Sequence, residues 1–191
     1  MDCVSCSAKT CRKTESCGAE KFDVSELQAD YELESNQKIL QSASQLVDNG
    51  RAGSLSRLDE IIEFIQTMNY KKPGLAYCYG MEQDAKLVKQ IFKSRGLGLK
   101  TVSCTVGGVA QDDINKAGCI HKVSCNPLGQ SRQLNAEAAD FVIVMGICLG
   151  HDILLQRELK ADFTTFVVKD RVYNHAPLMA VRQAGKAEIS Q

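Results

Sequence analysis

Residues 141–150 read FVIVMGICLG, an apolar run that is followed directly by the polar pair His151 and Asp152. A continuous apolar run of this length, interrupted and ended by glycine, is typical of a strand in a sheet that is covered on both faces. Sheets of this kind are parallel, because the helices that connect parallel strands lie on both faces. We therefore expect residues 141–150 to form a buried strand of an α/β domain.

The sequence on both sides of this strand alternates between strand-like and helical patterns. Strands are expected at 74–80, 99–108 and 163–170, and helices at 82–95, 111–117, 125–139, 151–159 and from Pro177 onward. Asn126 is a good N-cap residue and Pro127 suits the first turn of the helix that follows it. The alternation predicts an α/β fold, with a small parallel sheet of about four strands, flavodoxin-like or Rossmann-like, and flanking helices.

Three segments of different composition divide the chain. Residues 1–22 form a cysteine-rich segment, residues 23–72 hold a linker and two helices expected to pack on the body, and residues 73–191 form the α/β domain. The linker is placed at 23–35, and the two helices at 36–47 and 58–68, from their apolar residues at helical spacing. Ser56 and Asp59 resemble a capping box at the start of the second helix.

The composition is that of an ordinary globular protein and argues against several functional classes of protein. The chain has 191 residues, 44% of them hydrophobic, and its 23 basic and 23 acidic residues give a formal net charge of zero. Nucleic-acid binding would require a basic excess or a basic stripe. No apolar run reaches the roughly 18 residues of a membrane helix, and the N-terminus lacks a signal-peptide pattern. We expect a cytoplasmic protein, in which nine cysteines indicate metal binding or thiol chemistry rather than disulfides.

Cysteines follow the predicted strands at the points where the strands end. In an open parallel sheet, ligands bind beyond the carboxyl ends of the strands. The cysteines at this edge are Cys78, Cys104 and Cys148 at strand ends and Cys125 at a helix start. Taken singly, Cys78 or Cys104 would be a small buried apolar residue, as is also expected for Cys119. As a group, the four predict a second thiol cluster that binds zinc or an iron–sulfur cluster.

Charged and histidine side chains accompany this second cluster. The candidates for a catalytic role are Cys125, Cys148, His151, Lys169, Asp170, Arg171 and His175. Backbone alternation should point Lys169 and Arg171 to one side and Asp170 to the other, so that the two cations lower a thiol pKa at Cys125 or Cys148 and attract a small anionic ligand. The alternatives are that the cations pair with acidic neighbours and that the histidines cap helices. The sequence has neither a Walker-type loop nor a GxGxxG motif, so dinucleotide binding is unsupported.

The first seventeen residues contain Cys3, Cys6, Cys11 and Cys17 in an almost wholly polar context. Four thiolates within reach of one another can close a tetrahedral zinc site and give order that an apolar core cannot supply here. The spacing matches neither a double-knuckle zinc ribbon nor the common ferredoxin motifs. The alternatives are a disordered thiol-rich tail or a redox CxxC motif.

Three motifs together resemble one family. They are the N-terminal cysteines, CNPLGQSRQLNAEAADFVIVMGICLGHD (125–152) and FVVKDRVYNHAP (166–177). The chain is similar over nearly its whole length to uncharacterised prokaryotic proteins described only as metal-binding, the domain-of-unknown-function family eighteen-forty-seven. The residues matched in that pattern are Cys3, Cys6, Cys11, Cys17, Cys78, Cys104, Cys125, Asn126, Pro127, Cys148, Gly150, His151, Asp152, Lys169, Asp170, Arg171 and His175. The resemblance implies metal binding and no defined activity.

The sequence thus predicts a cytoplasmic metal-binding protein with two thiol sites, acting as a sensor or redox protein. The metal is Zn²⁺, or alternatively an iron–sulfur cluster. A first alternative is an enzyme that uses a cysteine thiolate or a metal, together with Lys169, Asp170, Arg171 and His151, on a small anionic substrate. A second alternative is an interaction module with structural zinc.

Overall fold

The computed structural model describes residues 1–118 and 121–189. Contacts between residues divide the chain into two compact units, Met1–Ala52 and Gly53–Gln191. No helix within the described residues combines the length and the apolar character needed to cross a membrane. The expectation for Cys119 falls outside the described residues.

The second unit contains a four-stranded parallel sheet, as expected. The strands are β1 (Pro73–Tyr77), β2 (Lys100–Ser103), β3 (Phe141–Met145) and β4 (Asp162–Val167), in the spatial order β2-β1-β3-β4. The central strand β1 pairs with β2 on one side and with β3 on the other, so that Leu75 lies between Thr101 and Ile143. All five residues of β3 are buried, which agrees with the continuous apolar run that predicted it.

Helices alternate with the strands in the order that the pattern predicts, because α3 precedes β1 and at least one helix follows each of the four strands. They are α3 (Arg57–Met68), the short 3-10 helix η2 (Tyr79–Met81), α4 (Glu82–Ser94), α5 (Gln111–Ile114), α6 (Pro127–Ala136), α7 (His151–Glu158) and α8 (Leu178–Ile189). Two predicted caps are present: the Ser56 hydroxyl accepts from the Asp59 N–H at 3.2 Å, and Asn126 accepts from the Gly129 N–H at 2.8 Å. Both satisfy backbone donors that a helix start would otherwise leave unpaired.

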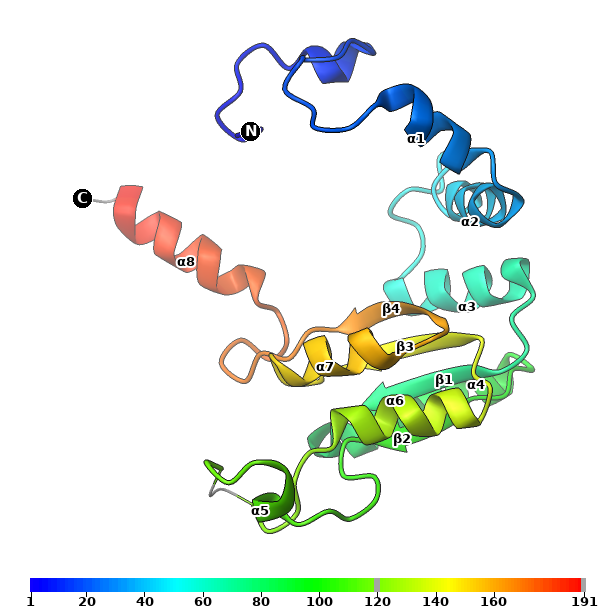
Figure 1. The fold of residues 1–191 in the computed structure, drawn as a ribbon, viewed down its shortest axis with the longest axis vertical. Helices are drawn as coiled ribbons and strands as arrows, with labels where there is room; N and C mark the ends of the chain where they lie inside the picture. Colours follow the sequence, from blue (N-terminus) through cyan, green and yellow to red (C-terminus); the bar gives the residue numbers. More distant parts are fainter. Residues whose placement is uncertain (119–120, 190–191) are drawn as a thin grey trace. The chain divides into compact units, whose positions relative to one another are not determined.

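The sheet is covered on both faces by helices (Figure 1). Leu75 and Ile143 point to a core shared with α3 and α4, whereas Ala76 and Val142 point to a core shared with α6 and α7. The connection after β1 therefore runs over one face, and those after β2 and β3 run over the other. Strand order reverses between β1 and β3, and a crevice forms beyond their carboxyl ends at such a switch point.

Gly146 ends β3 earlier than the sequence predicts. Its N–H donates to the Val167 carbonyl at 2.7 Å, and its φ of 62° lies in the left-handed region. A Cβ at this position would also collide with the side chain of Met81. The chain can bend here because glycine adopts this φ without strain and leaves room for Met81. The bend sends residues 147–150 along the carboxyl edge of the sheet instead of extending the strand.

The first unit contains η1 (Thr10–Lys13), α1 (Val24–Tyr31) and α2 (Glu34–Gln45). Helix α1 lies within the segment expected to be a linker, so this part of the chain is more regular than its sequence indicated. Asp23 caps α1 by accepting from the Ser25 N–H at 2.8 Å. None of the residues of α1 is buried. A cap and residues of good helix propensity therefore form this helix without an apolar face directed into a core.

Candidate functional site

Two cysteines lie side by side at the ends of neighbouring strands. Cys78 follows β1 and its N–H donates to the Met145 carbonyl at 3.2 Å, while Cys104 follows β2 and its N–H donates to the Tyr77 carbonyl at 2.9 Å. These bonds continue the parallel pairing by one residue, so both side chains face the core on the α6 and α7 side. Both cysteines are buried.

A third cysteine is held beside them by the cap of α6. The Asn126 N–H donates to the Cys104 carbonyl at 2.7 Å, and its side-chain amide donates to the Val106 carbonyl at 3.2 Å. Asn126 therefore ties the start of α6 to the end of β2. The preceding residue, Cys125, has its Sγ 3.7 Å from the Cys104 Sγ and is half-buried.

The fourth cysteine follows the bend at Gly146. The Cys148 carbonyl accepts from the His151 and Asp152 N–H groups, both at 3.0 Å, so this residue also holds the first turn of α7. Its side chain is half-buried and lies near enough to the Cys125 thiol to interact with it electrostatically. The four cysteines that the sequence placed at strand ends and at a helix start therefore lie at one edge of the sheet.

Two cations after β4 point at this thiol cluster, which consists of Cys78, Cys104, Cys125 and Cys148. Lys169 Nζ lies 3.5 Å from the Cys78 Sγ, and Arg171 Nη2 lies 3.1 Å from the Cys148 Sγ. The residue between them, Asp170, accepts through its carboxylate from two backbone N–H groups of the next turn, those of Val172 and Tyr173, both at 2.9 Å. The alternation expected for residues 169–171 is thus present in the structure.

His175 shapes this turn instead of facing the thiols. Its Nδ1 accepts from the Asp170 N–H at 3.1 Å, and its own N–H donates to the Asp170 carbonyl at 2.8 Å. The pair closes a loop that fixes the backbone on either side of Arg171. In the structure Asp170 and His175 therefore hold Arg171 in place, whereas Lys169 and Arg171 contact the thiols directly.

The cysteines of the thiol cluster differ in how their surroundings shift the pKa of the thiol. A hydrogen bond from the Cys104 thiol, the Gly80 N–H and the charge of Lys169 lower the pKa of Cys78 to about 5, against the opposing effect of burial. The same hydrogen bond and burial raise the pKa of Cys104. Burial also raises the pKa of Cys125, which the sequence had favoured, with Cys148, for activation. The hydrogen bond between Cys104 and Cys78 therefore lowers the pKa of Cys78 and raises that of Cys104.

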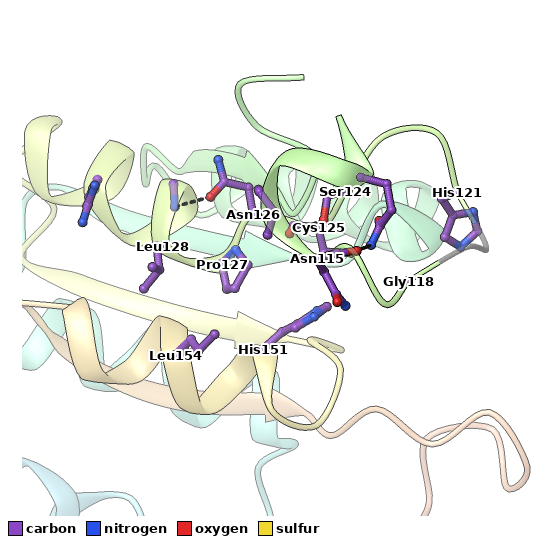
Figure 2. Close-up of a pocket in the computed structure, with 14 residues that line it drawn as sticks. Asn115, Gly118, His121, Ser124, Cys125, Asn126, Pro127, Leu128, His151 and Leu154 are labelled. Carbon is purple, nitrogen blue, oxygen red and sulfur yellow. Dashed lines mark hydrogen bonds between the residues drawn. The ribbon is translucent and has the colours of Figure 1, made fainter. Parts of the chain in front are cut away.

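A cavity of about 610 Å³ lies beside the cluster, with Cys125 in its wall. Residues of α6 and α7, of 111–118 and of 121–125 surround it (Figure 2). His151 reaches into this cavity from the start of α7, toward Asn115 on the facing wall. The described residues that line it are Gln111, Ile114, Asn115, Gly118, His121, Ser124, Cys125, Asn126, Pro127, Leu128, Gly129, Arg132, His151 and Leu154.

Sequence reasoning missed most of this lining. Arg132 could have been found, because Leu128 and Arg132 are four residues apart on the helix that Asn126 caps and so lie on one face. Asn115 and His121 carry no such signal, since the path of a loop cannot be inferred from periodicity. The His121 ring packs edge-on against the Tyr79 ring at a centroid distance of 6.0 Å.

Gln130 is a second residue that sequence reasoning missed. It is fully buried, and its side-chain amide donates to the Tyr77 carbonyl at 3.2 Å and to the Val102 carbonyl at 2.9 Å. These carbonyls lie one residue before Cys78 and two before Cys104. Gln130 therefore clamps the two strands directly beneath the cysteine pair.

The N-terminal cysteines are not gathered in this way. Cys3, Cys11 and Cys17 are exposed and Cys6 is half-buried; the Cys17 thiol donates to a Glu20 carboxylate oxygen at 3.5 Å. Across residues 1–118 and 121–189, no group of three or more His, Cys, Asp or Glu side chains is already arranged to hold a metal ion. Both thiol sets supply soft donors of the kind that zinc and iron–sulfur clusters prefer, but neither set is preorganised.

One protein family and one archaeal protein match most of the chain. The model of the family described as "Protein of unknown function (DUF1847)" matches residues 14–166. The chain belongs to this family. An uncharacterised protein of Methanocaldococcus jannaschii is 39% identical over 181 residues, which cover 92% of this chain and 90% of that protein. No solved structure matches. The family match contains all four cysteines of the thiol cluster and Cys17, and it begins after Cys3, Cys6 and Cys11.

Proposed function

We propose that this protein binds a soft metal centre, zinc or an iron–sulfur cluster, through Cys78, Cys104, Cys125 and Cys148. The observation that supports this most is the convergence of four thiols from four separate segments at the switch point of the sheet. Thiolates are the preferred donors for zinc and for iron–sulfur clusters. Burial favours such a role, because a buried thiolate needs a positive partner.

The spacing of the sulfurs is compatible with a shared metal. Two thiolates on one tetrahedral zinc ion, each with a Zn–S bond of about 2.3 Å, lie about 3.8 Å apart. The Cys104 and Cys125 sulfurs are 3.7 Å apart. Because no three donors in the described residues yet surround a common point, binding requires rotation of cysteine side chains, for which half-buried Cys125 and Cys148 have the most freedom.

The two neighbouring cations suit the charge of such a centre. Four thiolates around Zn²⁺ carry a net charge of about −2, which is costly at a half-buried site unless it is offset. Lys169 and Arg171 supply two positive charges, and each already donates toward a cysteine sulfur. Hydrogen bonds of this kind to the ligands of a metal fix their orientation and tune the centre.

A second metal site in the N-terminal segment is part of this proposal. Cys3, Cys6, Cys11 and Cys17 lie in a stretch with almost no apolar residues, and that stretch has no buried residue in the structure. Metal binding would give this segment the order that its side chains cannot provide by packing. If this site alone were filled, with one zinc ion, the protein would be an interaction module with structural zinc.

Elemental analysis and absorbance spectra of anaerobically purified protein test the proposal. Cys104→Ser should remove the metal of the sheet edge and leave any N-terminal metal, whereas Cys6→Ser should do the reverse. Cys119→Ser is the matched control, because it makes the same substitution outside both sets. A brown colour with iron and sulfide would identify an iron–sulfur cluster, and colourless protein with zinc would identify zinc. Equal metal content in wild type and Cys104→Ser would refute a metal at the edge.

Thiol catalysis is the second candidate, and the cavity beside Cys125 is the observation that favours it. In a metal-free protein, Cys125 would meet the substrate in the cavity, and Cys78, with its thiolate held by Lys169, would lie behind it in the same thiol cluster. Mass spectrometry after brief alkylation at neutral pH separates the two candidates. Rapid modification of Cys78 in protein that purifies without metal would favour the enzyme, and protection of Cys78 that is lost on chelation would favour the metal site.

A further inference from the structure

The cavity beside Cys125 has a charge pattern that metal binding does not account for. None of the described residues that line it is Asp or Glu, although the chain contains 23 acidic residues. The lining does include Arg132, His121 and His151. A small concave site with cationic and N–H-bearing side chains and without carboxylates attracts anions and repels cations.

Helix orientation adds to this pattern. The first turn of α6, at Pro127 and Leu128, forms part of the wall, and α7 begins at His151 in the wall as well. The N-terminal end of a helix carries partial positive charge and favours anions. The positive end of α6 thus faces the cavity together with the guanidinium of Arg132, whereas the first N–H groups of α7 already bond to the Cys148 carbonyl and the Asp152 carboxylate.

Asp152 and Glu158 adjoin the lining residues His151 and Arg132 but do not themselves line the cavity. Asp152 Oδ1 accepts from the Gly150 N–H at 3.0 Å and from the Ile153 N–H at 2.8 Å, at the start of α7. Glu158 lies 3.9 Å from Arg132 Nε, a loose and solvent-exposed pair. An anion in the cavity would therefore compete with only a weak partner for Arg132.

The rest of the lining is apolar. Ile114, Pro127, Leu128 and Leu154 contribute hydrophobic surface, and Asn115 offers an amide on the wall opposite His151 (Figure 2). A volume of about 610 Å³ is in the range of pockets for small organic ligands, which are mostly apolar with a few polar groups that fix orientation. A bare inorganic anion would leave this apolar surface unused.

We propose that this cavity binds a small organic anion, a carboxylate with an apolar body. Arg132 pairs with the carboxylate, and Leu128, Leu154 and His151 line the rest of the site. Bound there, the ligand lies against Cys125 and so beside the thiol cluster. This site does not depend on whether the cluster holds metal, since none of these four residues belongs to the cluster.

Fluorine NMR titration of the full-length protein tests the site with para-fluorobenzoate, a carboxylate with an apolar ring. The uncharged para-fluorobenzamide has nearly the same shape and serves as the matched ligand. Saturable binding of the benzoate is expected, with at least about fivefold weaker binding of the benzamide, because only the former makes charged hydrogen bonds.

Variants then locate the site. Arg132→Gln should weaken benzoate binding about three- to tenfold, since an exposed guanidinium contributes modestly, and should leave benzamide binding unchanged. Leu154→Ser should weaken both ligands. Arg157→Gln, on α7 but outside the lining, is the matched control and should change neither. Equal affinity for benzoate and benzamide, no saturable binding, or equal effects of Arg132→Gln and Arg157→Gln would each overturn the proposal. The metal content of Arg132→Gln should equal that of wild type, so failure of this site is separable from failure of the metal proposal.

Discussion

Lys169 Nζ lies 3.5 Å from the Sγ of Cys78, although the two residues are 91 positions apart in the chain. The contact joins the loop after β4 to the end of β1 across the intervening strand β3. It places a permanent cation beside a buried sulfur that also accepts a hydrogen bond from the Cys104 thiol. The Cys104 hydrogen bond and the charge of Lys169 together lower the pKa of Cys78.

Removing the charge of Lys169 should raise the pKa of Cys78 in the metal-free protein. Lys169→Met keeps the length of the side chain and removes both the charge and the hydrogen bond. The pKa of Cys78 is about 5 with Lys169 present, and it should rise in the variant while remaining below an ordinary thiol because Cys104 still donates. Thiolate absorbance against pH measures it, and Lys160→Met, outside the cluster, is the control. An unchanged titration curve would show that Lys169 does not stabilise the thiolate.

The stability of metal-free protein should depend on pH in a way that Cys78 controls. The pKa of Cys78 is about 5 in the folded protein, whereas a thiol in the unfolded chain has a pKa of about 8.5. Between these two pH values, the unfolded chain binds more protons at Cys78 than the folded protein does. The free energy of unfolding should therefore rise with pH across this window. Above it, stability should fall, because Cys104 has a raised pKa and keeps its proton only when folded.

Denaturant unfolding at a series of pH values measures this dependence, under reducing conditions and with a chelator present. Cys78→Ser should lose the rise that occurs between the two pKa values. Cys119→Ser, again the matched control, should keep it. If the difference between wild type and Cys78→Ser did not change with pH, the lowered pKa of Cys78 would be ruled out.

Gln130 should be needed for the stability of the sheet edge. Gln130→Leu keeps much of the volume but removes the donors to the Tyr77 and Val102 carbonyls, and should cost about 1–3 kcal/mol in the free energy of unfolding. Gln130→Glu should cost more, because a buried carboxylate cannot donate to these carbonyls and would face them with negative charge. Thermal or denaturant unfolding gives both values. Gln133→Leu, on the same helix but exposed, should have little effect.

Replacement of Gly146 should be more destabilising than replacement of an unconstrained glycine such as Gly98. Gly146→Ala should cost about 1–3 kcal/mol, because an L-residue is strained at this φ and its methyl group would displace Met81 from the core. Gly98→Ala is the matched control, since its added Cβ would meet open space and its φ is not in the left-handed region. Equal unfolding free energies for the two variants would contradict the role assigned to the bend.

Much of this architecture could be predicted from local sequence. The apolar run at 141–150, the capping residues Ser56 and Asn126, and the alternation of strands and helices predicted a four-stranded parallel sheet and the order of its helices, although the third strand ends at Met145. The rule that parallel strands end at a common edge brought Cys78, Cys104 and Cys148 together before any coordinates were considered. These inferences succeed because periodicity and capping act over a few residues and parallel pairing leaves few topologies.

Sequence by itself determined the fold class, the thiol edge and the direction of Lys169 and Arg171, since each depends on backbone alternation or strand ends. Only the tertiary structure decided which sulfur is the thiolate, because the pKa of Cys78 depends on Cys104 and Lys169, which reach it from other segments. The same is true of the cavity, whose walls come from three segments that no local pattern relates, and of Gln130, whose role appears only when α6 packs on the sheet. Contacts between residues that are far apart in the sequence shift the thiol pKa values and form the walls of the cavity. Neither property can be inferred from the periodicity of the sequence.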